Sequence, residues 1–370
     1  MGKGDAWSAY SLAVELTLRL DRSSCELDGA TIIQFLKWAS QSDLFLVPSR
    51  RQVSFNEKTH FRVSTTAKLA GRRTPIIGYG RDEDYSLALI KAYAEAVERI
   101  VAVECQNELG VAATMDISLD ESGMLTIAPS CRPQLMPEET LRTSNGWAVH
   151  FSKESAIKLA FLEALERHLL LRSFLKSGWH GFVRGKAIEL DGYILESLSS
   201  VESICGFQAG MVAAKLRRHS GYAFGYFCDS VRSFGDSARW LHAMLEALEP
   251  AKIYDNFSAP ELIAKLKLTT DSIEKTQLIY LKEKLDLMEM PSFETPIRDR
   301  SQPLIGNLVV VDIGNKLGMG CNFYGAFVYG RDFIPLFFKE MLDAEGTKAV
   351  VAALLANGLE PKIPDVHPIL

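Results

Sequence analysis

The sequence predicts an α+β (mixed α/β) fold in which antiparallel-rich sheets are covered by repeated amphipathic helices. Segments 88–99 and 156–167 align without a gap and share a helical pattern of apolar residues. A third segment, 243–249, carries the same Glu-Ala-apolar-Glu core. A glycine-bearing strand or loop precedes each helix, and residues 211–230 fit a hairpin that turns near 219–221. These alternating elements indicate helices packed on sheets.

The composition is that of a folded protein of ordinary charge. With 370 residues, of which 47% are hydrophobic and 24% charged, the chain can bury one large core or two moderate ones. A net charge of −5 argues against a nucleic-acid binder, because such proteins need a concentrated basic face. The six cysteines show no Cys-x-x-Cys spacing, so neither a zinc site nor a disulfide framework is expected.

The N-terminus lacks the apolar run of a signal peptide, and no uncharged stretch approaches the ~20 residues that cross a bilayer. Scattered cysteines suit a reducing compartment. We therefore expect a cytoplasmic protein that binds neither nucleic acid nor membranes.

Residues 1–58 are predicted to form an N-terminal portion of helices and a strand, packed on a main domain at 59–370. This portion carries no recognisable motif. Its expected elements are a helix at 7–20, a helix at 32–40, a strand at 44–47 and, after Pro48, a basic turn at 49–51.

The main domain begins with a β-branched run and continues through the repeated helices. Its β-branched and periodic segments predict four elements in order: a strand at 59–69, a helix at about 84–106, an edge strand and loop at 109–142, and the second repeated helix. Trp179 to Val183 and the 190s read as connecting structure before the 211–230 hairpin.

The C-terminal part is predicted to hold a lysine-rich helical insertion at about 251–300, closed by Pro291 and Pro296. A buried strand at 308–312, a strand pair at 323–338 and a helix at about 339–357 follow, the helix ending at Asn357-Gly358. Three prolines exclude a helix or a central strand from the tail at 361–370.

The two repeated helices carry the same set of charges. Each copy places two glutamates and an arginine at i, i+3 and i+4, on one helix face: Glu95, Glu98 and Arg99, then Glu163, Glu166 and Arg167. Carboxylate oxygens suit Mg²⁺ and a guanidinium suits phosphate. A single copy is typical of a charged surface face, but a gapless repeat favours a site. The third copy has Pro250 in place of the arginine.

Several common nucleotide and hydrolase motifs are absent. Gly185-Lys186 is followed by Ala187, so no P-loop is formed, and Gly78-Tyr-Gly80 continues to Glu83 where a dinucleotide fingerprint needs glycine. Neither His-Glu-x-x-His nor Gly-x-Ser-x-Gly occurs. What remains is a set of clustered glutamates, which raise one another's pKa unless a cation is bound. The sequence therefore predicts an ATP and Mg²⁺ site built without a glycine loop.

These residues resemble the YcaO superfamily, whose members carry Glu-x-x-Glu-Arg helices after Ser-Asn-Gly and Gly-x-Gly prefaces and often end in a proline-rich tail. Here the prefaces are Ser144-Asn-Gly146 and Gly78-Tyr-Gly80, and the match runs from about Arg62 to the C-terminus. Within the family the chain is most similar to the stand-alone cyclodehydratase (heterocyclase) subunit of microcin B17-type azole synthetases. The resemblance implies a YcaO-like fold with an ATP-binding catalytic domain at 59–370.

The resemblance also implies roles for individual residues. Family carboxylates that hold Mg²⁺ and ATP match Glu95, Glu98, Glu163 and Glu166; phosphate-contacting arginines match Arg99 and Arg167; and a further nucleotide contact matches Lys91. Ser155 stands where relatives often have an acid, so either the adjacent Glu154 supplies the ligand or the site has one ligand fewer. The terminal carboxylate of Leu370 is a candidate active-site group, with an inert tail as the alternative.

The implied reaction is ATP-dependent conversion of Cys, Ser or Thr in a ribosomally made precursor peptide to thiazoline or oxazoline. Thioamidation and macroamidine formation are alternatives within the family, and a non-catalytic nucleotide-binding scaffold is an alternative outside catalysis. The implied partners are the precursor peptide, a leader-peptide-binding subunit and an FMN-dependent azoline dehydrogenase subunit, in a hetero-oligomer that makes an azole-modified bacteriocin.

Overall fold

The computed structural model describes residues 16–20, 28–55, 58–68, 76–104, 115–130, 146–218, 221–231, 238–258, 261, 298–300, 303–330, 332–334 and 344–362. The chain divides into two compact units. Unit 1 comprises Met1–Ser118, Met124–Ala164 and Gly306–Tyr329, and unit 2 comprises Leu119–Gly123, Leu165–Ile305 and Gly330–Leu370. Among the described residues, no helix has the length and apolar character that a membrane span requires.

A six-stranded sheet falls mostly in unit 1, in the order β1-β6-β5-β13-β14-β7. Antiparallel pairing joins β1 to β6, β13 to β14 and β14 to β7. The strands are β1 (Leu16–Arg19), β5 (Met115–Leu119), β6 (Met124–Pro129), β7 (Trp147–His150), β13 (Leu304–Asp312) and β14 (Tyr324–Tyr329).

Stacked aromatic side chains form much of the core of unit 1. Trp147 on β7 stacks on Phe327 of β14 with ring centroids 4.8 Å apart. Phe35 stacks on Phe323 at 5.1 Å and meets Phe151 edge-on at 5.1 Å. Phe35 comes from α1 (Gly29–Gln41), whose first turn is capped where the Thr31 amide donates to the Asp28 carboxylate at 2.8 Å. The short helix α7 (Ile313–Lys316) follows β13.

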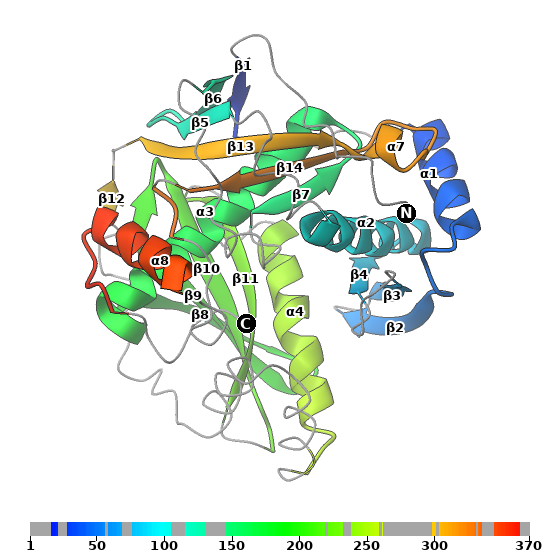
Figure 1. The fold of residues 1–370 in the computed structure, drawn as a ribbon. Coiled ribbons are helices and arrows are strands. Elements are labelled where there is room, and N and C mark those ends of the chain that lie inside the picture. Colours follow the sequence, from blue (N-terminus) through cyan, green and yellow to red (C-terminus); the bar gives the residue numbers. More distant parts are fainter. Residues whose placement is uncertain are drawn as a thin grey trace. The chain divides into compact units, whose positions relative to one another are not determined.

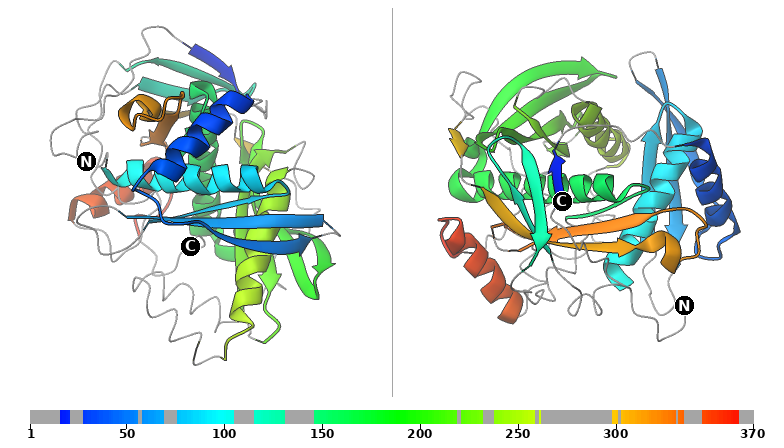
Figure 2. Two further views of the ribbon diagram at one scale, coloured as in Figure 1. Left: turned by 90° about the vertical axis from the view of Figure 1, so that its right-hand side faces the viewer. Right: turned by 90° about the horizontal axis from the view of Figure 1, so that it is seen from above.

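A second sheet of unit 1 supports the helix that carries the first charge triplet. Strands β2 (Ser49–Phe55), β3 (Lys58–Ala67) and β4 (Ile76–Asp82) pair antiparallel in that order, and α2 (Tyr85–Glu104) lies along them (Figure 2). Gly78 and Gly80 explain how closely β4 approaches α2. A Cβ at Gly80 would lie 1.9 Å from the Ala88 carbonyl oxygen, and one at Gly78 would lie 2.1 Å from that of Ala92. The glycine preface is therefore a packing requirement.

Unit 2 is built on a five-stranded sheet, in the order β11-β10-β9-β12 with β8 paired to β9. Its strands are β8 (Phe182–Leu190), β9 (Tyr193–Ile204), β10 (Phe207–Lys215), β11 (Tyr222–Ser230) and β12 (Arg298–Arg300). Helix α4 (Ala238–Tyr254) packs along β10 and β11, as Figure 1 shows. Here Gly225 permits the approach, since a Cβ would lie 2.0 Å from the Ala243 carbonyl oxygen.

Helix α3 (Lys153–Ser177) begins in unit 1 and ends in unit 2, where the short helix η4 (Gly178–Gly181) follows it. The last described helix, α8 (Ala344–Ala356), belongs to unit 2 and ends at Asn357 and Gly358, the latter at φ +66°. This C-cap was expected from the sequence and is confirmed.

The α+β class and the antiparallel-rich sheets are confirmed. The confirmed segments are the helix at 32–40 (α1), the strand at 59–69 (β3), the helix at 84–106 (α2), the strand at 308–312 (β13) and the hairpin at 211–230 (β10 and β11). The hairpin's predicted turn falls partly on residues 219–220, which lie outside the described residues.

Some element predictions are wrong for identifiable reasons. Phe45 forms only an isolated bridge, with Ala67, and the expected turn at 49–51 begins β2. The exposed Arg50 and Arg51 suggested a turn, but charged side chains are common on an edge strand. The predicted connection after Trp179 is the long pair β8 and β9, which the serine-rich sequence of β9 disguised.

One further prediction needs correction, and others fall partly outside the described residues. In the segment expected to be helical, 7–20, residues Leu16–Arg19 form β1, and 7–15 lie outside the described residues. Of the predicted strand pair at 323–338, one strand is confirmed as β14, and the second stays a prediction because 331 and 335–338 lie outside the described residues. Most of 109–142, 251–300 and the tail beyond 362 is also not described, apart from β5 and β6, the end of α4, and β12. The predicted domain boundary at 58/59 stays a prediction.

The close approach of β4 to α2 predicts that Gly80→Ala lowers the free energy of unfolding by about 1–3 kcal/mol, because the new methyl group has no room. Chemical denaturation measures the change. Gly29→Ala is the matched control, since nothing lies within 4 Å of a Cβ there, and it should unfold like the parent. Equal stability of the two variants would contradict the packing requirement.

Candidate functional site

Two glutamates, one from each of two helices, approach the carboxylate of Glu98 in unit 1. Burial raises the pKa of the Glu98 carboxyl on α2 well above its ordinary value, and the charges of Glu163 on α3 and Glu95 on α2 raise it further. Arg99 and the backbone N–H of Val149 act in the opposite direction. The structure thus brings together carboxylates 65 positions apart in the sequence, counted from Glu98 to Glu163.

Glu95 and Arg99 are tied to each other and to the neighbouring strand. The Arg99 guanidinium donates to the Glu95 carboxylate at 2.5 Å and to the Ile77 carbonyl at 2.7 Å. The Tyr79 amide donates to the other Glu95 oxygen at 2.8 Å. These contacts fix both side chains against β4, so their positions are set before any ligand arrives.

Lys91 lies one turn before Glu95 on α2 and joins a different partner. Its ammonium donates to the Asp82 carboxylate at 2.7 Å and to the Arg81 carbonyl at 3.2 Å. The side chain is 56% exposed, so this ion pair is a weak constraint. A nucleotide contact by Lys91 stays a prediction.

The second charge triplet continues on α3 in unit 2. Glu166 is buried, and burial raises the pKa of its carboxyl above the ordinary value. The charge of Glu246 adds to this rise. The charges of Arg167, Arg239 and His242 oppose it without cancelling it. The Arg167 guanidinium lies 3.4 Å from the Glu166 carboxylate. Helix α4 supplies the other three residues, and His242 lies 3.1 Å from Glu246.

The third repeat in the sequence includes Glu246 but not Arg239 or His242, which the sequence patterns did not predict. The negative charge of Glu246 raises the pKa of the Glu166 carboxyl, so the third repeated helix, α4, contributes a charged residue near Glu166 in unit 2. The available signal was the periodicity of α4, since Arg239, His242 and Glu246 are spaced by three and four residues and share one helix face.

Glu154 and Ser155 lie at the start of α3. The backbone N–H of Glu154 itself lowers the pKa of its carboxyl, helped by the Ser152 hydroxyl, which donates to it at 2.9 Å. The Glu154 carboxylate therefore lies at the N-terminus of α3, where the helix dipole stabilises a negative charge. Its role as a metal ligand stays a prediction. Leu370 lies outside the described residues.

The carboxylates around Glu98 suit a magnesium ion that is bound together with a nucleotide, rather than a magnesium ion bound by protein ligands alone. Within the described part of the chain, no three His, Cys, Asp or Glu side chains meet the geometry of a metal site. Magnesium commonly binds through one or two carboxylates, with phosphate oxygens and waters completing its ligands. The oxygen donors of Glu95, Glu98 and Glu163, and the like-charge conflict at Glu98, suit such a cation.

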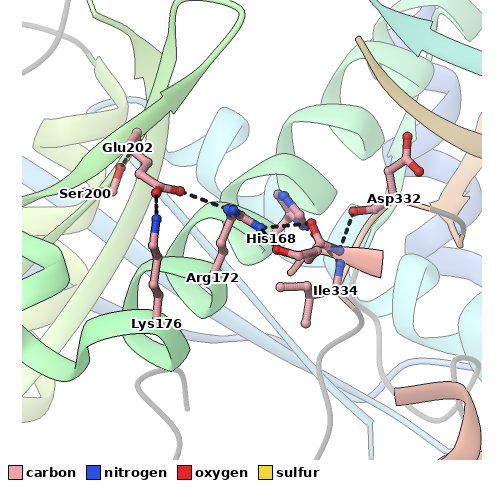
Figure 3. A network of polar contacts seen from close by, with 8 residues as sticks. His168, Arg172, Lys176, Ser200, Glu202, Asp332 and Ile334 are labelled. Atoms are coloured by element: carbon pink, nitrogen blue, oxygen red, sulfur yellow. Dashed lines mark hydrogen bonds and ion pairs between the residues drawn. The ribbon is translucent and has the colours of Figure 1, made fainter. Parts of the chain in front are cut away.

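A buried ion network holds the C-terminal half of α3 in place (Figure 3). The Arg172 guanidinium donates to the Glu202 carboxylate at 2.9 Å and to the Asn357 carbonyl at 2.6 Å. Lys176 pairs with the other Glu202 oxygen. Burial alone would raise the pKa of Glu202, but the hydrogen bonds from Lys176 and Arg172 outweigh it and lower the pKa.

The network extends to the chain segment before α8. The Asn357 amide donates to the Asp332 carbonyl at 3.1 Å. Nearby, the Ile334 amide donates to Nδ1 of His168 at 3.1 Å, a contact visible in Figure 3. His168 is fully buried and accepts this hydrogen bond as the neutral imidazole. These contacts position β9 and α8 on α3, all within unit 2.

No protein-family model matches the chain, and no curated protein matches it. Solved structures to which the chain is similar include the following three. A YcaO from Methanopyrus kandleri, bound with AMPPCP and Mg²⁺, is 13% identical over 80% of this chain and 89% of that chain, with a TM-score of 0.44. The E. coli microcin synthetase McbBCD complex is 10% identical over 88% and 98%, with a TM-score of 0.49. A heterocyclase in complex with substrate and cofactor is 12% identical over 82% and 52%, with a TM-score of 0.45.

The buried network predicts that Arg172→Ala lowers the free energy of unfolding by about 3–5 kcal/mol, because Glu202 is left buried beside the exposed Lys176 alone. The loss is present above the unfolded-state pKa of Glu202, ~4.3, and fades as pH falls through its lower folded-state pKa. Denaturant titration at pH 7 and pH 3 measures both values.

The control is Lys252→Ala, which breaks an ion pair with Asp191 between side chains 33% and 39% exposed, and should cost less than about 1 kcal/mol. An Arg172→Ala protein no less stable than this control would contradict the structural role of the network.

The crowding at Glu98 predicts that Glu98→Gln raises the free energy of unfolding of the ligand-free protein by on the order of 1 kcal/mol at pH 7, because one of three like charges is removed. Thermal and denaturant unfolding in the presence of a chelator measure the change. Glu121→Gln, at an exposed turn, is the control and should leave stability unchanged. Destabilisation by Glu98→Gln would show that the carboxylates are not in conflict.

Proposed function

We propose that this chain is an ATP- and Mg²⁺-dependent cyclodehydratase of the YcaO type. Its substrate is a ribosomally made precursor peptide, in which Cys, Ser or Thr residues become thiazoline or oxazoline. The observation that carries the proposal is the approach of both Glu163 on α3 and Glu95 on α2 to Glu98 on α2, two helices with the same charge triplet.

The unit 1 carboxylates are proposed to bind magnesium. Glu98 is partly buried beside two other carboxylates, an arrangement that costs free energy in the absence of a cation. Glu95 is already oriented by Tyr79 and Arg99, which reduces the entropy lost when it binds a ligand. Glu154 is a further candidate ligand at the start of the same helix that carries Glu163.

The arginines are proposed to bind phosphate oxygens. Arg99 is 40% exposed while anchored to Glu95 and the Ile77 carbonyl, so its remaining N–H groups are available on a fixed guanidinium. Arg167 in unit 2 is held beside the buried Glu166. An oriented cation stabilises charge that develops during phosphoryl transfer, which depends on positioning and electrostatics.

In the proposed reaction, a substrate thiol or hydroxyl attacks the preceding amide carbonyl. ATP supplies the phosphoryl group that turns the former amide oxygen into a phosphate leaving group. The ring closes as phosphate departs, so each ring formed removes one water equivalent from the peptide and converts ATP to ADP and phosphate. The protein's part is to orient the phosphates and exclude hydrolysis.

The proposal also includes a cellular compartment and partner subunits. The chain is proposed to act in the cytoplasm with a leader-peptide-binding subunit and an FMN-dependent azoline dehydrogenase, in the synthesis of an azole-modified bacteriocin. The C-terminal carboxylate of Leu370 and the side chain of Lys91 are proposed as additional contacts of the reacting groups.

The proposal predicts that Glu98→Gln and Glu163→Gln each abolish measurable binding of Mg-ATP and lower peptide-dependent phosphate release by about 10²–10³-fold, since each removes a charge from the proposed metal set. Calorimetry and a phosphate assay, with partner subunits and precursor peptide, measure these effects. Glu121→Gln is the matched control and should behave as the parent.

Mass spectrometry of the peptide identifies the reaction. Loss of one water per ring supports cyclodehydration, replacement of oxygen by sulfur indicates thioamidation, and water loss that links the N-terminal amine to the backbone indicates macroamidine formation. If the Glu98→Gln protein modified the peptide as fast as the parent, the chain would be a scaffold rather than the enzyme.

A further inference from the structure

An aromatic row on β11 leads to Arg167. Tyr222, Phe224 and Tyr226 alternate along this strand and therefore share one face of the sheet. Phe224 lies between the other two, with ring centroids 6.3 Å from Tyr222 and 6.5 Å from Tyr226. The Arg167 guanidinium lies over the Tyr226 ring, 5.4 Å from its centroid. The row therefore ends on an arginine of the second charge triplet.

The position of Tyr226 is fixed from three sides. Its strand neighbour Gly225 contacts α4 so closely that no side chain fits there. Tyr226 pairs with Met211 in the β10–β11 ladder, and Met211 is fully buried. Phe224 stacks in turn on Trp179, with centroids 5.9 Å apart and ring planes 16° from parallel. Such a ring is a rigid support for whatever lies on it.

The aromatic row also connects the middle of α3 with the short helix that follows it. Arg167 lies in α3, and Trp179 lies in η4, directly after α3 ends. Trp179 is further held edge-on by Phe174 of α3, with centroids 5.4 Å apart. The contacts from Arg167 through Tyr226 and Phe224 to Trp179 therefore brace the C-terminal half of α3 against β11.

The two arginines of the repeat are held in different ways. Arg99 is held by hydrogen bonds to Glu95 and the Ile77 carbonyl. The contacts of Arg167 include an ion pair with Glu166 at 3.4 Å, longer than a good hydrogen bond, and the Tyr226 ring, over which its guanidinium lies 5.4 Å from the centroid. Stacking on a ring restricts the tilt of a guanidinium while leaving its N–H edge available for hydrogen bonds.

We propose that Tyr226 is a positioning residue that orients the Arg167 guanidinium for phosphate binding. This inference rests on the proposed function and deepens it, because it assigns the orientation of one phosphate-binding group to an aromatic support on another element. The ring face carries the effect, and the phenol hydroxyl does not.

The test is a double-mutant cycle on the full chain, with partner subunits and peptide for the activity arm. Tyr226→Leu should lower kcat/KM for ATP about 3- to 30-fold, the range expected for loss of one cation–π contact. Tyr226→Phe should restore activity to within about twofold of the parent, because the ring is kept. In an Arg167→Ala background, Tyr226→Leu should have no further effect.

Tyr222→Leu is the matched control, because Tyr222 contacts Phe224 from the same strand face, at the end of the row away from Tyr226. It should leave kcat/KM unchanged. The same cycle on the equilibrium constant of unfolding provides a readout that needs no activity, and Tyr226→Leu and Arg167→Ala should be non-additive there as well.

The outcomes separate the inference from the proposed function. If Arg167→Ala is inactive while Tyr226→Leu matches the parent, or if the two effects are additive, the positioning role is overturned and the proposed function stands. If Tyr226→Phe lowers kcat/KM as much as Tyr226→Leu, the aromatic ring is not what orients Arg167, and the inference fails. If Arg167→Ala retains full activity, both the inference and the proposed role of Arg167 are overturned.

Discussion

The interaction on which the rest depends is the approach of like charges at Glu98. A partly buried carboxylate beside Glu95 and Glu163 is unfavourable in a protein without a cation. Close packing nevertheless holds this arrangement in place. Strand β4 packs on α2 through Gly78 and Gly80, and the Tyr79 amide of β4 donates to the Glu95 carboxylate. A costly arrangement held by close packing is characteristic of a functional site.

Helix α3 contributes charged residues to both units. It carries Glu163 among the unit 1 residues and Glu166 and Arg167 among those of unit 2, one turn further along the same helix. In unit 2 its surroundings are rigid: Arg172 and Lys176 hold Glu202, and Tyr226 supports Arg167. These contacts hold the unit 2 part of α3 at several points, and phosphoryl transfer depends on such positioning of charged groups.

The sequence predicted the fold class and the charged residues because both leave periodic patterns. The Glu-x-x-Glu-Arg repeat and the glycine prefaces identified α2 and α3, and the structure adds a physical reason for the glycines. Strands β8 and β9 were missed, since β9 is rich in serine and its burial comes from pairing with neighbours on both sides. The supports Tyr226 and Glu202 lie far from α3 in sequence, so only tertiary contacts reveal them.

The most direct test of the central claim is the location of the metal. Anomalous diffraction from crystals of the protein grown with Mn²⁺ and a non-hydrolysable ATP analogue would mark the cation. The account predicts a manganese peak coordinated by carboxylate oxygens of Glu95, Glu98 or Glu163, with phosphate oxygens completing its ligands. A nucleotide-bound manganese away from all three carboxylates would contradict it.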